Sequence, residues 1–335
     1  MVRSALTVAL EIADRLLSDN VAQRRDVLWC EERGDGSKRL LVAPLEVANL
    51  VADHLLADHA AVLTSATLRI GGEFAPAAHE VGLHDAKDYR ALEVPAPFDY
   101  GRQAIRYVAR ALPPPAAGGG GPEALAEITG LLQASDGGAL GLFSSRRAAE
   151  RAAEHVRGAT DLPVLCQGED TLPELVRQFR ADPRTSLFGT LSLWQGVDVA
   201  GLTNRLVIID RIPFPRPDDP VVQARSEVAA SRGANAFLSV SAAHAALLLA
   251  QGAGRLIRST TDRGVVAVLD SRIATARYGG FLLRSLPPMW PTTDPEVARA
   301  ALRRLAQEAL ATGAGDRDGG GAVGRRSRAD ATAPA

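Results

Sequence analysis

Apolar and polar residues follow two rhythms along the chain, and each rhythm predicts a different kind of element. Short apolar runs bounded by turn residues predict buried strands. Between these runs, segments such as 123–134 and 146–157 have the composition and spacing of helices. The alternation predicts an α/β fold, a parallel sheet with helices on both faces and ligands at the carboxyl ends of its strands. The strand candidates are GALGLFSS, DLPVLCQ, TSLFGT, NRLVIIDRI and GVVAVL.

The first hundred residues have a different pattern. Residues 1–24 predict an amphipathic helix, and DVLWCEE and RLLVAPL predict a hairpin around the turn RGDGSK. A helix is expected from Pro44 through LEVANLVADHLLADH, followed by a short buried strand in AAVLTSATL. The segment from VPAPFDY to YVARAL predicts a further strand and a short helical or extended continuation. A loop is expected at 113–122, where prolines and glycines break regular structure.

Composition narrows the class of protein. A hydrophobic content of 46% in 335 residues allows a proper buried core. The net charge of -1 gives no global basic field, so a nucleic-acid site would have to be a local patch. Without a long apolar run or a signal peptide, a soluble, cytoplasmic protein with no membrane partner is expected. Cys30 and Cys166 lie far apart, and their spacing indicates neither a zinc site nor an iron–sulfur cluster.

The stretch QGAGRLIR, residues 251–258, carries the most distinctive polar pattern. An alanine- and leucine-rich helix is expected to run through Gln251, which would place Arg255 and Arg258 on the same helix face. Gly252 and Gly254 would allow something to approach the backbone closely, and a phosphate-bearing ligand fits such a cluster. The alternative is a surface helix end whose arginines interact with the helix dipole.

These residues resemble a known family. The pattern Q-x-x-G-R-x-x-R resembles motif VI of superfamily two helicases, in the form typical of DinG- and XPD-type DNA helicases. Three further segments resemble other motifs of that family in the expected order. These segments are LTSATL from Leu63 for motif III, LGLFSSRRAAERAA from Leu140 for motif IV, and FGTLSLWQGVDVAG from Phe188 for motif V. The likeness covers about residues 25–290.

The resemblance implies roles for individual residues. Arg255 and Arg258 correspond to arginine fingers that stabilise transition-state charge on ATP, and Gln251 would position water or the γ-phosphate. Nucleotide contacts are expected at Gly196, Asp198 and Gly254. Coupling between ATP and DNA is expected at Ser65 and Thr67. Single-stranded DNA is expected to contact Ser144, Ser145, Thr190, Ser192 and Trp194.

Several of these residues also have a simpler structural interpretation. Ser145 has the position of a helix N-cap, and an N-cap can bind a DNA phosphate at the same time. Ser65 and Thr67 could simply cap the segment after a strand. A role for Trp194 in the hydrophobic core is as compatible with the sequence as a role in base stacking.

The remaining motifs of a complete helicase are missing from the sequence. The lysines are Lys38 and Lys87, and neither fits the pattern G-x-x-x-x-G-K-[ST] of a phosphate-binding Walker A loop; a DEAH box is also absent. The resemblance therefore implies a remnant of a first RecA-like domain at 1–95, a second RecA-like domain at 96–310 and a disordered tail at 311–335.

The implied function is an ATP-dependent DNA helicase that moves 5′ to 3′ on single strands. ATP and magnesium would be held by a missing N-terminal helicase half, so this chain alone should not hydrolyse ATP. The alternative is a non-catalytic fragment that binds single-stranded DNA or another partner. An unrelated α/β transferase is a third possibility, but the glycine-rich loop expected after its first strand is absent.

Overall fold

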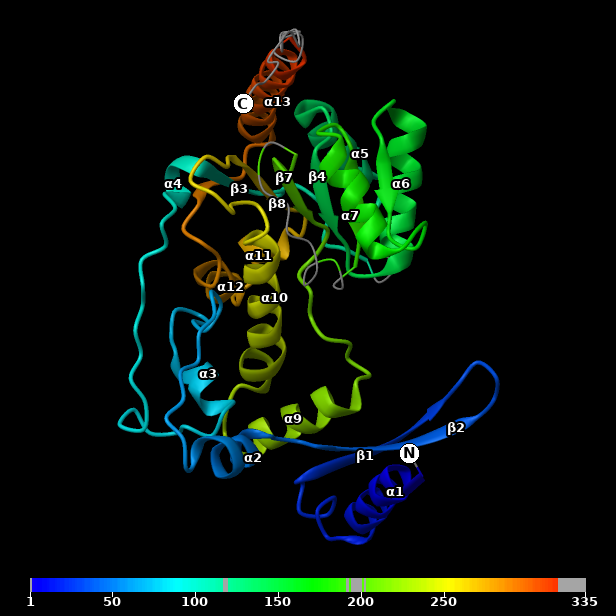
Figure 1. Ribbon diagram of the computed structural model, residues 1–335, viewed down its shortest axis with the longest axis vertical. Helices are drawn as coiled ribbons and strands as arrows, with labels where there is room; N and C mark the ends of the chain where they lie inside the picture. Colours follow the sequence, from blue (N-terminus) through cyan, green and yellow to red (C-terminus); the bar gives the residue numbers. More distant parts are fainter. Residues whose placement is uncertain (1, 117–119, 191–192, 194–200, 202, 319–335) are drawn as a thin grey trace, which may run out of the picture.

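A seven-stranded parallel sheet forms the centre of the computed structural model, which describes residues 2–116, 120–190, 193, 201 and 203–318 (Figure 1). The strand order is β5-β6-β4-β7-β8-β3-β9, and every neighbouring pair is parallel. The strands are β3 (Ala104–Val108), β4 (Ala139–Leu142), β5 (Val164–Cys166), β6 (Ser186–Gly189), β7 (Leu206–Ile209), β8 (Gly264–Val268) and β9 (Trp290–Thr292).

The central strands are buried on both faces, as their continuous apolar runs predict. In β7, Val207 and Ile209 belong to one core cluster, whereas Leu206 and Ile208 belong to the other. The first cluster includes α7 (Leu172–Ala181), α10 (Ala243–Ala253) and α12 (Gly279–Arg284). The second includes α5 (Pro122–Ser135), α6 (Arg146–Ala159) and α13 (Pro295–Asp318). The predicted α/β fold, with helices on both faces of a parallel sheet, is confirmed.

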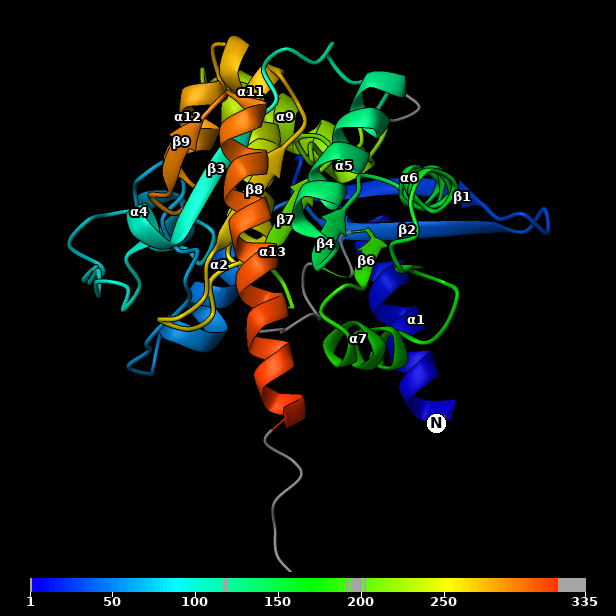
Figure 2. The same cartoon turned by 90° about the horizontal axis from the view of Figure 1, so that it is seen from above.

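Helix α13 closes the second face of the sheet and lies beside α5 (Figure 2). Arg299 of α13 forms an ion pair with Glu127 of α5, and Leu302 is fully buried. The helix continues through 311–318, residues that the sequence assigns to a disordered tail. The rest of that tail lies outside the described residues.

The N-terminal part forms the predicted helix and hairpin. Helix α1 spans Val2–Leu17, and the antiparallel strands β1 (Asp26–Glu32) and β2 (Lys38–Pro44) pair in the register Asp26↔Pro44. Arg15 of α1 forms an ion pair with buried Asp26 at the start of β1. Figure 1 shows the hairpin extending away from the large sheet, beside α1 and α9 (Pro220–Ser231).

Two predictions for residues 44–68 are wrong. The helix expected from Pro44 is limited to α2 (Ala48–Val51) and a π-helical turn, η1 (Ala52–Leu56). The buried strand expected in AAVLTSATL does not form, and Val62 is 92% exposed. A strand needs a neighbour to satisfy its backbone groups, and no described strand pairs with this segment.

Short elements connect this N-terminal part to the sheet. Helix α3 (Ala75–His79) is followed by irregular chain, and the strand expected near VPAPFDY begins later, at Ala104. The intervening residues form α4 (Tyr100–Gln103), which Asp99 caps by accepting a hydrogen bond from the Arg102 amide. Gly71 donates its amide to the Ser285 hydroxyl after α12, which joins the N-terminal part to the helices of the sheet.

Candidate functional site

The QGAGRLIR segment bends where the sequence predicts a continuous helix. Helix α10 ends at Ala253 with Gly254 as its C-cap, so Gln251 is helical while Arg255 lies in a turn and Arg258 in a loop. The prediction that all three side chains share one helix face is therefore wrong. The helix ends because the chain must reverse direction to enter the parallel strand β8.

The loop lies over the amino edge of the sheet. Asn204, which precedes β7, donates its side-chain amide to the Arg255 carbonyl at 2.9 Å. Gln103, which precedes β3, donates its side-chain amide to the carbonyls of Ser259, Thr260 and Asp262 at 3.0–3.1 Å. Parallel strands all begin at the same edge, so Arg255 and Arg258 do not lie at the carboxyl ends where the fold predicts ligands.

Asp262 fixes the loop that carries the arginines. Its buried carboxylate accepts the amides of Arg258 at 2.7 Å, Ser259 at 2.8 Å and Gly201 at 3.0 Å, and the Ser259 hydroxyl at 2.7 Å. Gly201 ends the motif V segment, so one carboxylate joins motifs V and VI. Asp262 was not predicted from the sequence, although the pattern S-x-x-D before an apolar run is typical of a capping box, in which the acid bonds back to the serine.

Two features around the loop are suited to a polar ligand. The side-chain oxygen of Gln251 is buried and accepts no hydrogen bond from the described residues, and such an acceptor needs a water or ligand donor. Arg255 and Arg258 are half-buried. Burial raises the pKa of Tyr100, which begins α4, and the positive charge of Arg258 opposes that rise.

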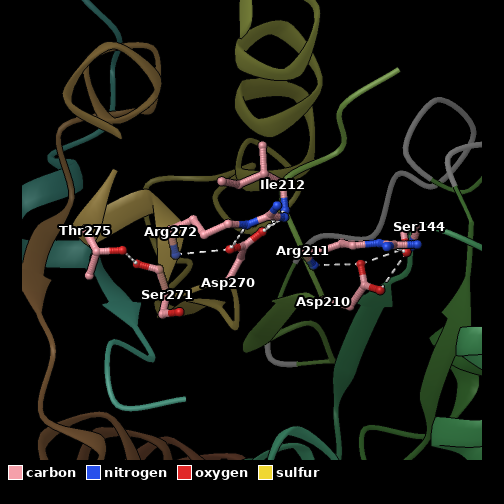
Figure 3. A network of polar contacts seen from close by, with 8 residues as sticks. All are labelled: Ser144, Asp210, Arg211, Ile212, Asp270, Ser271, Arg272 and Thr275. Atoms are coloured by element: carbon pink, nitrogen blue, oxygen red, sulfur yellow. Dashed lines mark hydrogen bonds and ion pairs between the residues drawn. The ribbon is translucent and has the colours of Figure 1, made fainter. Parts of the chain in front are cut away.

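A second polar network lies at the carboxyl edge (Figure 3). Asp210 follows β7 and accepts hydrogen bonds from the Ser144 amide at 3.0 Å, the Ser144 hydroxyl at 2.9 Å and the Arg211 amide at 2.7 Å. The Arg211 guanidinium also donates to the Ser144 hydroxyl. Burial raises the pKa of Asp210 to about 6, although the bonds from Ser144 and the charge of Arg211 favour its ionised form.

Asp270, which follows β8, holds the loop after β7 together with Asp210. Its fully buried carboxylate accepts the Ile212 amide at 3.0 Å and the Arg272 guanidinium at 2.9 and 2.7 Å. The sequence analysis assigned no role to Asp210 or Asp270. Each is the first polar residue after a buried strand, and that pattern is the signal that could have identified both.

The predicted DNA contacts that the structure describes lie at this carboxyl edge. The Ser145 hydroxyl accepts the Ala148 amide at 3.2 Å and caps α6, so the N-cap interpretation is confirmed. Thr190 follows β6 and donates its amide and hydroxyl to the Gln167 side-chain oxygen at 2.8 and 3.0 Å. Ser144 donates both its amide and its hydroxyl to Asp210, which gives it a structural role.

The structure describes some, but not all, of the other predicted residues. Ser192, Trp194, Gly196 and Asp198 lie outside the described residues. Ser65 and Thr67 bond each other through their hydroxyls at 3.1 Å in the irregular N-terminal segment. A Cβ atom at Gly254 would lie 3.1 Å from the Ala250 carbonyl oxygen. The atom that approaches the Gly254 backbone closely therefore belongs to the preceding turn of α10.

Comparison with known proteins identifies the larger part of this fold. Residues 128–289 match the family profile described as a helicase C-terminal domain. These residues belong to that family. The chain is 55% identical over 311 residues to the ATP-dependent helicase DinG of Mycobacterium tuberculosis strain ATCC 25177 / H37Ra, which covers 91% of this chain and 47% of the relative.

Two further comparisons agree with this assignment. The chain is 38% identical over 262 residues to the ATP-dependent DNA helicase YoaA of Escherichia coli K12, covering 78% of this chain and 40% of the relative. A solved structure of S. tokodaii Xpd4 aligns with a TM-score of 0.55 and 17% identity over 77% of this chain and 50% of that chain, which supports the fold. The resemblance to the C-terminal half of DinG- and XPD-type helicases is confirmed.

This chain spans about half the length of the curated relatives that it matches. Within the described ranges, no group of three or more His, Cys, Asp or Glu side chains could hold a metal ion. No described helix combines the length and apolarity needed to cross a bilayer.

Proposed function

We propose that this chain supplies the second RecA-like domain of an ATP-dependent DNA helicase that unwinds DNA in the 5′ to 3′ direction. Residues 96–310 would form that domain, and residues 1–95 would be the end of the first. A polypeptide with Walker A and DEAH motifs would hold the nucleotide and its magnesium ion. The observation that carries the proposal is the loop of Arg255 and Arg258, fixed by Asp262 at the amino edge of the sheet.

The arginines would act on ATP held by that other polypeptide. Arg255 and Arg258 would stabilise the negative charge that develops on the transferring phosphoryl group. Gln251 would position the attacking water or the γ-phosphate, and its buried oxygen lacks a hydrogen-bond donor among the described residues. Gly254, together with Gly196 and Asp198 of motif V, would complete the nucleotide side of the site.

Single-stranded DNA would follow the opposite, carboxyl edge. Ser145 at the N-terminus of α6 would bind a backbone phosphate, because free amides and the helix dipole favour an anion there. Ser144 would position that helix start through Asp210, and Thr190 would contribute a further hydroxyl. We expect further DNA contacts from Ser192 and Trp194 of motif V.

A fusion protein tests this proposal. The part of the M. tuberculosis relative that this chain does not match, which we expect to carry the Walker A and DEAH motifs, would be joined to the first residue of this chain. The chain alone should not turn over ATP, whereas the fusion should do so in the presence of single-stranded DNA. Arg258→Ala should lower that rate by roughly 10³-fold or more. Arg303→Ala, at an exposed position on α13, is the matched control and should leave the rate unchanged.

The same fusion tests the direction of unwinding. A duplex with a 5′ single-stranded overhang should be opened, and a duplex with only a 3′ overhang should not. ATP turnover by the unaided chain would contradict the need for a second polypeptide. A fusion that binds DNA without turnover would support the second candidate, a non-catalytic fragment that binds single-stranded DNA. That candidate is favoured by the fact that Ser145 and Thr190 both belong to this chain and lie away from the arginines.

A further inference from the structure

Three aromatic rings from separate segments meet beside the carboxyl-edge network. Phe214 follows β7, Phe237 begins the π-helical turn η2 (Phe237–Ala242), and Tyr278 precedes α12. Their ring centroids are 5.3 Å apart for Phe214 and Phe237, 5.5 Å for Phe214 and Tyr278, and 5.1 Å for Phe237 and Tyr278. We call these residues the aromatic cluster.

The aromatic cluster is only partly covered by the rest of the chain. Phe214 and Tyr278 are half-buried and pack against the core, whereas Phe237 remains 41% exposed. The rings pack edge to face or tilted, with interplanar angles of 51°, 85° and 52°. Phe214 and Tyr278 pack against the core, whereas the exposed part of Phe237 gains no stabilisation from burial. A flat ring held rigidly at the surface is suited to stacking.

Two arginines lie beside the cluster. The Arg272 guanidinium lies over the Phe214 ring, with its central carbon 5.9 Å from the centroid, and 34% of the Arg272 side chain is exposed. Its partner Asp270 is completely buried, so the exposed member of this ion pair is the arginine. Arg277, next to Tyr278 in the sequence, is also exposed. This surface therefore favours a ligand that combines flat apolar groups with negative charge.

We propose that the aromatic cluster is a stacking platform for a base of single-stranded DNA, with Phe237 as the stacking ring and Arg272 beside the adjoining phosphate. The inference rests on the proposed function, because it extends the DNA path from Ser145 and Asp210 along the same edge to Asp270. Stacking on a ring tolerates any base, which suits an enzyme that must move along every sequence. Arginine next to aromatic rings is the usual composition of such sites.

The test separates bases from phosphates. Binding of this chain to a fluorescein-labelled oligothymidylate is compared, by fluorescence anisotropy, with binding to an abasic oligomer of the same length and charge. The unmodified chain should bind the oligothymidylate about tenfold more tightly. Phe237→Ala should lose most of that preference while its affinity for the abasic oligomer stays the same. Phe237→Trp should retain the preference, since it keeps an aromatic face.

Control variants distinguish stacking from a loss of folding. Phe237→Leu keeps an apolar side chain without a ring, and it should lose the base preference while its thermal unfolding midpoint stays near that of the unmodified chain. Trp290→Ala removes an aromatic residue that is 49% exposed on β9, and it should leave both affinities unchanged.

Several results would overturn the platform. One is equal binding of the two oligomers by the unmodified chain, and another is no binding of the oligothymidylate. A Phe237→Leu variant that keeps the full base preference would also exclude stacking on this ring. The helicase proposal is judged separately by ATP turnover of the fusion protein, so an inactive fusion whose Phe237 variants still lose base preference would leave the platform standing.

Discussion

Three buried aspartates organise the two edges of the sheet. Asp210 and Asp270 hold the loop after β7 at the carboxyl edge, and Asp262 holds the arginine loop at the amino edge. Their positions after or between apolar runs are visible in the sequence, but their partners are not. The Ile212 amide that Asp270 accepts is 58 residues away along the chain, and only the pairing of β7 with β8 brings the two together.

Asp210 should make the stability of the protein depend on pH in a specific window. Burial raises its folded-state pKa from 3.8 to about 6, so the folded state binds this proton more tightly than the unfolded state does. The resulting stabilisation is complete below about pH 3.8 and is lost as the pH rises through 6. A shift of this size corresponds to about 3 kcal/mol. The side chain of the Asp210→Asn variant cannot ionise, so this variant should not lose stability through position 210 as the pH rises.

Urea unfolding of both proteins at several pH values checks this expectation. The stability of the unmodified chain relative to Asp210→Asn should fall between about pH 4 and pH 6.5 and then stay constant. Because the other titrating groups are shared, the difference between the two proteins isolates Asp210. Parallel stability curves across this window would show that Asp210 has an ordinary pKa.

The elements of the sheet were largely predictable, and the errors have a common physical cause. The runs around Leu140, Leu187 and Val207 form strands because their residues are apolar enough to be buried on both faces. AAVLTSATL has a similar composition but no strand beside it, so the same pattern gives exposed, irregular chain. The helix expected through Arg258 ends at Ala253, since helix propensity does not encode the reversal needed to enter β8.

The end of α5 depends on an arginine from a distant element. Arg205, just before β7, is fully buried and donates to the carbonyls of Ser135 at 2.7 Å and Asp136 at 2.9 Å. Arg205→Ala would leave these carbonyls unsatisfied and create a cavity, and it should lower the free energy of unfolding by on the order of 3 kcal/mol. Thermal and urea unfolding measure this loss.

A second arginine at the same helix end provides the control. Arg184 also pairs with Asp136, through the carboxylate, but its side chain is 48% exposed. Arg184→Ala should change the free energy of unfolding by no more than about 0.5 kcal/mol, because exposed ion pairs contribute little. Equal effects of the two substitutions would mean that the buried bonds of Arg205 do not stabilise the end of α5.

At the scale of the whole molecule, the two groups of candidate residues lie on opposite edges of one sheet. The family resemblance correctly indicated the fold and the order of the motifs, but linear order does not show that Ser145 and Arg258 are separated by the length of the strands. The structure shows this separation and identifies Asp262 and Gly201 as a link between motifs V and VI. Under the proposed function, nucleotide and DNA would therefore bind at opposite edges of this sheet.

This separation predicts that DNA binding and ATP chemistry can be lost independently. The double variant Arg255→Ala/Arg258→Ala should bind the labelled oligothymidylate with unchanged affinity, because neither side chain lies at the carboxyl edge. In the fusion protein it should abolish ATP turnover stimulated by DNA, since both guanidinium groups that would face the phosphates are gone. Anisotropy and phosphate release measure the two properties on one sample. A parallel loss of oligothymidylate affinity would mean that the arginines contact DNA, and the assignment of the amino edge to the nucleotide would then be wrong.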